Sequence, residues 1–162
     1  AGERTFQLLT QAVGRAGRGD KPGFAVIQTY QPEHYAVVQA AAQDYESFYQ
    51  EEILYRELGG YPPACHLLAV QVFSQDEKAG ERLAATLAER VKARISERGT
   101  TLLGPSPATI GRINDVYRRV IYLKSKDYAK LVALKDELEQ FLATAQISRE
   151  NVQFDFDPMN FL

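Results

Sequence analysis

Hydrophobic residues recur with two different spacings in residues 65–162, and these spacings predict alternating strands and helices. Residues 67–73, 101–103, 116–124 and 152–156 have the apolar runs or the alternation that is typical of strands. Two stretches between these strands repeat apolar residues every three or four positions, as amphipathic helices do. The resulting order, β-α-β-β-α-β, predicts an α+β domain of the split-βαβ or ferredoxin-like type.

Polar residues and a glycine at the ends of these two helices predict where they begin and end. Ser74 followed by Glu77 has the form of a capping box, in which the hydroxyl and the carboxylate accept hydrogen bonds from each other's backbone amides. Gly99 is expected to lie just beyond the end of this first helix. The second helix is expected to be capped by either Ser125 or Asp127.

Residues 1–60 show a different pattern, in which helices surround a single strand. Residues 3–16 carry a helical apolar stripe, and a glycine-rich turn separates them from a strand-forming run at residues 24–30. Two further helices are expected at residues 32–42 and 45–58. Because a single strand cannot form a stable sheet, this pattern indicates a piece of a larger α/β domain.

A boundary between two domains is predicted where glycines and prolines interrupt the pattern. Gly59 and Gly60 suit the end of a helix, and Pro62 and Pro63 prevent a helix from continuing. We therefore expect one domain in residues 1–60 and a second, self-contained domain in residues 61–162.

The composition excludes several classes of protein. Of the 162 residues, 45% are hydrophobic and 25% are charged, which is typical of a globular chain and argues against intrinsic disorder. One cysteine, Cys65, excludes a disulfide framework within the chain and fits a reducing cytosol, and His34 and His66 have no partners at metal-ligand spacing. No metal site is expected in these residues. No run approaches the roughly 18 apolar residues of a membrane-spanning helix.

The net charge of -2 hides a basic segment between acidic ones. Residues 110–130 contain six basic and two acidic side chains, so this segment alone carries +4. Its basic residues are interleaved with aromatic ones, an arrangement that suits a phosphate backbone with stackable bases. The alternative is a solvated hairpin edge, which the charge alone favours. Strand alternation also predicts that Arg118 and Arg119 lie on opposite faces.

One short motif, Gln11-x-x-Gly14-Arg15-x-Gly17-Arg18, carries candidate chemistry. Two arginines three positions apart at a helix end point to one side, and guanidinium groups bind phosphate through paired hydrogen bonds. This is the chemistry of an arginine finger, which meets the charge on a transferring phosphoryl group. The alternative is a glycine-rich helix end with solubilising arginines. The leading glutamine, the helix before the motif and the predicted strand after it favour the functional interpretation.

This motif resembles motif VI of superfamily 2 helicases, and the rest of the chain resembles one of their families, the PriA replication-restart helicases. The resemblance rests on Tyr61-Pro62-Pro63, Gly104-Pro105-x-Pro107, Tyr117-Arg118 and Asp155-x-Asp157-Pro158, in this order. It implies that residues 1–60 are the end of a RecA-like helicase lobe with α/β structure, and that residues 61–162 are a C-terminal domain similar to a ribosomal small-subunit protein.

The resemblance also implies what the parent protein does. PriA helicases recognise forked DNA and D-loops, unwind DNA in the 3′→5′ direction with ATP, and help to reload the replicative helicase with other primosome proteins. They also bind the acidic C-terminal tail of the single-stranded DNA-binding protein. A cytoplasmic, nucleoid-associated protein without a membrane partner is therefore expected.

Site residues follow by motif match. Arg15 and Arg18 would face the ATP γ-phosphate, with Gln11 and Gly14 beside the nucleotide. The residues expected to face DNA are those of the basic hairpin and its flank: Arg112, Tyr117, Arg118, Arg119, Lys124 and Lys126.

Several parts of the helicase machinery are missing from the sequence. It contains no P-loop G-x-x-x-x-G-K-[ST], no Walker B carboxylates and no zinc-binding cysteines. ATP, Mg²⁺ and Zn²⁺ are therefore expected to be bound by other parts of the parent, and this chain, as a C-terminal fragment, is expected to have no ATPase activity alone. The alternative is a non-catalytic buttress, or a binding module for the tail of the single-stranded DNA-binding protein.

Overall fold

A computed structural model describes residues 2–16, 23–95 and 99–158. The chain divides into two compact units, Ala1–Gly59 and Gly60–Leu162, which we call the first and second units. Each unit has a hydrophobic core of its own, so the two are described separately.

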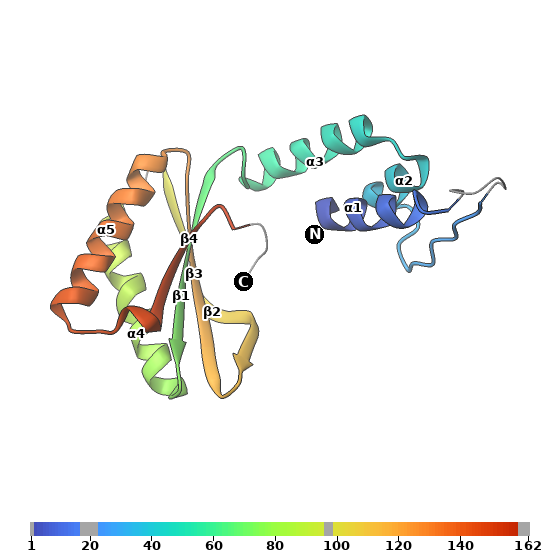
Figure 1. The fold of residues 1–162 in the computed structure, drawn as a ribbon. Helices are drawn as coiled ribbons and strands as arrows, with labels where there is room; N and C mark the ends of the chain where they lie inside the picture. The colour runs from blue at the N-terminus through green and yellow to red at the C-terminus, as the bar shows by residue number, and fades with distance from the viewer. Residues whose placement is uncertain (1, 17–22, 96–98, 159–162) are drawn as a thin grey trace. The chain divides into compact units, whose positions relative to one another are not determined.

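The described part of the first unit consists of three helices, α1 (Gly2–Val13), α2 (Tyr35–Ala42) and α3 (Tyr45–Gly59) (Figure 1). Its core contains Phe6, Ala36, Ala40 and Phe48. The rings of Phe6 and Phe48 stack with their centroids 4.1 Å apart, which fixes α1 against α3. The two alanines let α2 approach both helices closely.

The strand predicted at residues 24–30 is absent from the structure. These residues are irregular, and the side chains of Phe24 and Val26 are each 93% exposed. A strand needs a neighbouring strand to bond its backbone amides and carbonyls, and the described residues of the first unit offer none. The expectation that residues 1–60 show the α/β structure of a helicase lobe is therefore not met in the described part, which is helical.

A polar network joins the three helices of the first unit. The Tyr35 hydroxyl donates a hydrogen bond of 2.5 Å to Glu52, and Arg56 donates to Glu52 (2.8 Å) and to Glu3 (2.6 Å). Burial alone would raise the pKa of the Glu52 carboxyl, but the hydrogen bonds from Tyr35 and Arg56 lower it. This network holds α1, whose last turn leads to Arg15, in a fixed position on α2 and α3.

The second unit has the predicted order of elements. Its strands and helices are β1 (His66–Ser74), α4 (Glu77–Lys92), β2 (Thr100–Ile113), β3 (Val116–Ser125), α5 (Tyr128–Thr144), the short 3₁₀ helix η1 (Arg149–Asn151) and β4 (Val152–Phe156). The four strands form one antiparallel sheet in the order β2-β3-β1-β4. Figure 1 shows α4 and α5 together on one face of this sheet. The domain is thus α+β, as expected.

The core of the second unit lies between the sheet and its two helices. Every second side chain of β1, namely Leu68, Val70 and Val72, points toward the helices. Ile121 and Leu123 of β3 point to the same side, and all five side chains are fully buried. The residues between them on each strand face the other side of the sheet. No helix covers that side in the described part of the unit, although Ala69 and Val120 on it are also buried. We call this helix-free side the open face.

The helix ends differ in part from the predictions. The capping box at Ser74 is wrong, because Asp76 caps α4 by accepting a 2.7 Å hydrogen bond from the Ala79 amide. Ser74 bonds the backbone of Asp76 instead. The helix ends at Lys92, so Gly99 lies well beyond its end. Of the two alternatives for α5, Asp127 is the N-cap.

Strand β2 is longer and more irregular than predicted. Its pairing with β3 shifts twice, first between Leu103 and Ser106 and then between Pro107 and Arg112. At the second shift, residues 108–111 of β2 lie opposite the single residue Arg118 of β3. The hairpin then closes through Asn114 and Asp115, both with positive φ, which is the conformation of a type I′ turn.

Candidate functional site

The open face carries a basic and aromatic set of side chains on its two central strands. Arg118, Tyr122 and Lys124 of β3 share this face with Gln71 and Phe73 of β1. The Arg118 guanidinium donates a 3.3 Å hydrogen bond from Nη2 to Gln71 Oε1 and lies 5.7 Å from the Phe73 ring centroid. Its Nε is buried and has no hydrogen-bond partner among the described residues. The face thus holds a cation whose hydrogen-bonding capacity is only partly used.

Lys124 lies at the end of the open face where β1 begins. Its Nζ is 3.5 Å from the centroid of the Tyr61 ring, so the Tyr-Pro-Pro segment supplies an aromatic surface for this cation. Burial raises the pKa of the neighbouring Cys65 thiol, while the charges of Lys124 and Lys126 act in the opposite direction. Lys126 is exposed just after β3. Two cations therefore lie near this strand end.

The other hairpin candidates lie elsewhere. Arg119 faces α4 and forms a 3.3 Å ion pair with Glu81, and only 16% of its side chain is exposed. Arg112 and Tyr117 lie beside the hairpin turn, where Arg112 forms a 2.6 Å ion pair with Asp115 and stacks over the Tyr117 ring at 5.0 Å. The structure thus separates Arg118 from Arg119, as strand alternation predicts, and removes Arg119 from the open face.

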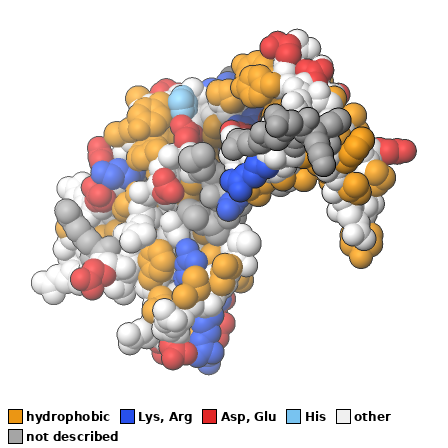
Figure 2. Space-filling view, turned by 45° about the vertical axis from the view of Figure 1, so that its right-hand side comes forward, with side chains coloured by type: hydrophobic (Ala, Val, Ile, Leu, Met, Phe, Trp, Pro, Cys, Tyr) orange, Lys and Arg blue, Asp and Glu red, His pale blue; other side chains and the backbone are white. Residues whose placement is uncertain are grey.

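Figure 2 shows how these charges lie on the surface. Lys and Arg side chains lie among apolar ones, with some acidic side chains, over the lower end of the second unit, where the β2–β3 hairpin ends in Figure 1. Residues 100–125, which contain this hairpin, have four basic side chains and one acidic side chain, a balance of +3. Mixed basic and apolar surfaces of this kind suit nucleic acid.

Asp157 fastens the end of the sheet in a way that the sequence pattern did not indicate. Its Oδ1 accepts a 2.7 Å hydrogen bond from the Leu67 amide, its Oδ2 lies 3.1 Å from His66 Nδ1, and its own amide donates to the Leu67 carbonyl. The ring of Tyr128 packs on both His66 and Phe156, each at 5.1 Å. The sequence pattern Asp155-x-Asp157-Pro158 contributes to the family resemblance, but it does not indicate what Asp157 does. That role becomes visible only when β1 is paired with β4.

Replacing Asp157 by alanine is expected to lower the free energy of unfolding of the chain by about 1–3 kcal/mol, because the buried Leu67 amide loses its acceptor. Asp157→Asn retains an acceptor oxygen and is expected to recover most of that loss. Denaturant unfolding followed by circular dichroism measures both, with Asp155→Ala, which replaces an exposed carboxylate on β4 two positions earlier, as the matched control. Equal stability of the alanine and wild-type chains would show that Leu67 does not depend on this carboxylate.

The motif in the first unit is only partly described. Gln11 lies in the last turns of α1 and Arg15 in the turn that follows, and both side chains are exposed. Gly14 and Arg15 continue the helical hydrogen bonding through their amides to the carbonyls of Thr10 (2.9 Å) and Ala12 (3.2 Å). Arg18 lies outside the described residues. The described part fits one contribution to a phosphate site, an exposed guanidinium at a helix end.

The described residues can be set against the requirements of a metal site and of a membrane-spanning helix. Within residues 2–16, 23–95 and 99–158, no group of three or more His, Cys, Asp or Glu side chains is placed to hold a metal ion. None of the helices in the same part of the chain has the length and apolar character needed to cross a membrane.

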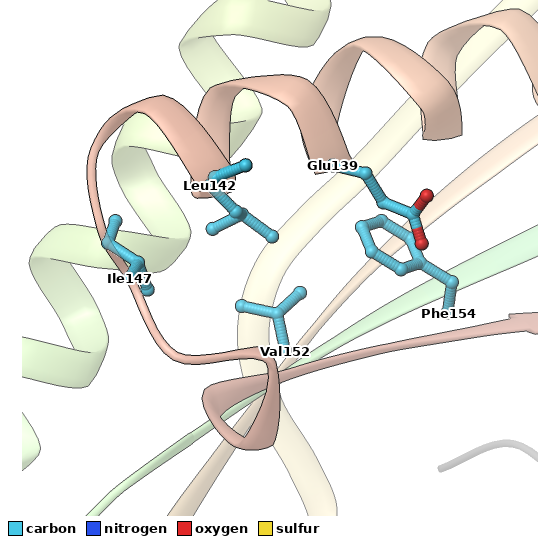
Figure 3. A pocket seen from close by; sticks show the side chains of 6 residues that line it. Glu139, Leu142, Ile147, Val152 and Phe154 are labelled. Atoms are coloured by element: carbon cyan, nitrogen blue, oxygen red, sulfur yellow. The ribbon is translucent and has the colours of Figure 1, made fainter.

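Two cavities lie on the helical side of the second unit. The first, of about 80 Å³, is enclosed mainly by apolar side chains of α5 and β4, with Glu139 at its rim (Figure 3). It is well below the several hundred Å³ of typical ligand pockets. The second, of about 320 Å³, is lined by α5 residues including Lys130 and Leu134, by Ile95 just after α4 and by Thr100 of β2, with the Arg94–Glu137 ion pair. Neither cavity is lined by a predicted nucleotide- or DNA-facing residue.

Comparison with known proteins identifies relatives for nearly the whole chain. Residues 57–159 match the family described as the primosomal protein N C-terminal domain. The replication restart protein PriA of Bacillus subtilis is 40% identical over 157 residues, 96% of this chain and 19% of the relative. The proteins of the same name from Thermotoga maritima and Synechocystis are 36% and 32% identical over 90% and 98% of this chain. The chain spans about a fifth of the length of these curated relatives.

Proposed function

This chain belongs to the family of primosomal protein N C-terminal domains, and from that membership we propose that it is the C-terminal part of a replication-restart DNA helicase. The parent would use ATP and Mg²⁺ to unwind DNA in the 3′→5′ direction, would recognise forked DNA and D-loops, and would help to reload the replicative helicase. Its zinc site would lie in other parts of the parent. The chain matches only about the C-terminal fifth of each relative. This supports placing the ATP-, Mg²⁺- and Zn²⁺-binding parts of the parent in residues outside this chain.

The first unit, in this proposal, completes the second helicase lobe. Arg15 and Arg18 would meet the γ-phosphate as arginine fingers, with Gln11 and Gly14 beside the nucleotide. The exposed position of Arg15 after α1 supports this role. Because the sequence has no P-loop, the chain alone would not hydrolyse ATP, and measurable turnover by the purified chain would contradict the assignment.

The second unit, in the same proposal, binds DNA on its open face. One observation carries this part: Arg118 and Lys124 share a helix-free sheet face with the aromatic side chains of Phe73 and Tyr122. Cations on such a face can contact phosphates while the rings stack on bases. Arg112, Tyr117 and Lys126 would extend the surface at its two ends. Arg119 is left out because it faces α4 and pairs with Glu81.

Fluorescence anisotropy with labelled forked DNA tests the proposal. The purified chain is expected to bind at low salt and to lose affinity steeply as salt rises, because each contacted phosphate releases counterions. Blunt duplex DNA of the same length serves as the comparison for fork preference. A chain that binds neither substrate at low salt would favour the alternative role as a buttress between helicase lobes.

A second candidate function is binding of the acidic tail of the single-stranded DNA-binding protein. The cavity of about 320 Å³ between α5 and the segment that follows α4 favours it, since apolar Ile95 and Leu134 line this cavity together with the cation of Lys130. An acidic peptide with an apolar end would match this combination. Titration of such a peptide, with Lys130→Glu as the variant that should abolish binding, tests this candidate independently of DNA.

A further inference from the structure

Strand β2 exposes more apolar surface than an ordinary edge strand. In the described part of the second unit, large hydrophobic side chains are prominently exposed at four positions, and three of these are on β2. They are Leu103 (42% exposed), Ile110 (59%) and Ile113 (42%). Burial of such side chains against a ligand is favourable, so exposed apolar residues that gather near one another are candidates for a contact surface.

Two of the three residues are near the far end of the hairpin. Ile110 belongs to the excursion of residues 108–111, and Ile113 pairs with Val116 next to the turn. They are three positions apart along the chain, so their Cα atoms are at most about 10 Å apart. Arg112 lies between them in sequence and is exposed, with a surface ion pair to Asp115 and a cation–π contact with the Tyr117 ring.

The edge of β2 is poorly suited to an added protein strand. Pro105 and Pro107 have no amide hydrogen to donate, and the two register shifts break the regular spacing of the remaining backbone groups. These features block edge-to-edge pairing with a second copy of the chain. The balance of +3 in residues 100–125 points instead to a polyanion.

We propose that Ile110 and Ile113 form an apolar wedge that contacts bases at the junction between paired and unpaired DNA. Arg112 would bind the adjacent phosphate, exchanging its exposed ion pair with Asp115 for the DNA backbone. Apolar side chains flanked by arginine are the combination that proteins insert at base steps that they unstack. A fork junction offers such a step at low cost, because its bases are already partly unstacked. The wedge rests on the proposed DNA-binding function and adds the way in which that surface would engage a fork.

Forked DNA with 2-aminopurine at the junction tests the wedge, because this base becomes brighter when it is unstacked. Saturating wild-type chain is expected to raise its fluorescence about twofold or more. Ile110→Thr/Ile113→Thr keeps the β-branched shape of both side chains, removes their apolar ends, and is expected to abolish the rise while the fork is still bound. Val38→Thr is the matched control, since Val38 is a β-branched side chain that is 47% exposed on α2 of the first unit, and it should behave as wild type.

The outcomes separate the wedge from the wider function. Binding by anisotropy with no fluorescence rise in the wild type, or an equal rise in the double threonine variant, would overturn the wedge and leave DNA binding intact. No binding by anisotropy would overturn both. A concentration-dependent dimer that the double variant abolishes would show that the surface joins two copies, which also contradicts the wedge.

Discussion

Replacing Arg112, Arg118 and Lys124 together by glutamine is expected to weaken the binding of forked DNA and to flatten its dependence on salt. Each phosphate contact contributes about 0.9 to the slope of log affinity against log salt. Three contacts account for a slope difference of about 2.7, so between about 50 and 200 mM salt the wild type should lose roughly 40-fold more affinity than the variant. Anisotropy titrations at several salt concentrations measure both slopes.

The matched control for this variant removes the same charge from another surface. Lys78, Arg82 and Lys92 are exposed on α4, on the helix-covered side of the sheet, and their replacement by glutamine changes the net charge equally. If the α4 variant loses as much affinity and slope as the hairpin variant, DNA responds to overall charge and the open face is not the binding surface. Thermal unfolding of both variants establishes that the half-buried Arg118 can be replaced without loss of the fold.

The fold of the second unit could be predicted because each of its strands and helices has a clear pattern of apolar residues within its own segment. Alternation in residues 116–124 and 152–156 reports one covered sheet face, and helical spacing reports the helices that cover it. The cap of α4 was mispredicted because Ser74 and Asp76 are both good N-cap residues, and the one that caps depends on where β1 ends. That position is set by pairing with β3, which a local pattern does not contain.

The sequence names the candidate DNA-facing residues, but it does not predict which of them lie together on one surface. Alternation predicts that Arg118 and Arg119 lie on opposite faces, and the register of β3 against β1 confirms it. The ion pair of Arg119 with Glu81 and the stacking of Lys124 on Tyr61 depend on segments that are distant in sequence. The hydrogen bond from the Leu67 amide to Asp157 likewise joins residues 90 positions apart, so no periodic pattern in the sequence predicts it.

Residues 24–30 of the first unit have a clear strand-forming sequence, but the described residues of that unit contain no neighbouring strand with which they could pair. Phe24 and Val26 are almost fully exposed, although burying two such side chains contributes about 3–6 kcal/mol. Strand-forming residues of this kind are expected to pair where neighbouring strands are present. In the proposed parent, the rest of the helicase lobe would supply those strands.

Amide hydrogen exchange of residues 24–30 is therefore expected to slow by about a thousandfold or more when the remainder of the proposed lobe is present. Opening a paired, buried strand costs about 4 kcal/mol or more, and each 1.4 kcal/mol slows exchange about tenfold. Exchange measured by mass spectrometry on this chain and on the full-length parent makes the comparison. The peptide around Phe48, which is buried in the first unit already, is the internal control and should change far less. Equally fast exchange of residues 24–30 in both proteins would mean that this segment is a loop in the parent as well, and that its apolar residues serve a contact other than the sheet of a helicase lobe.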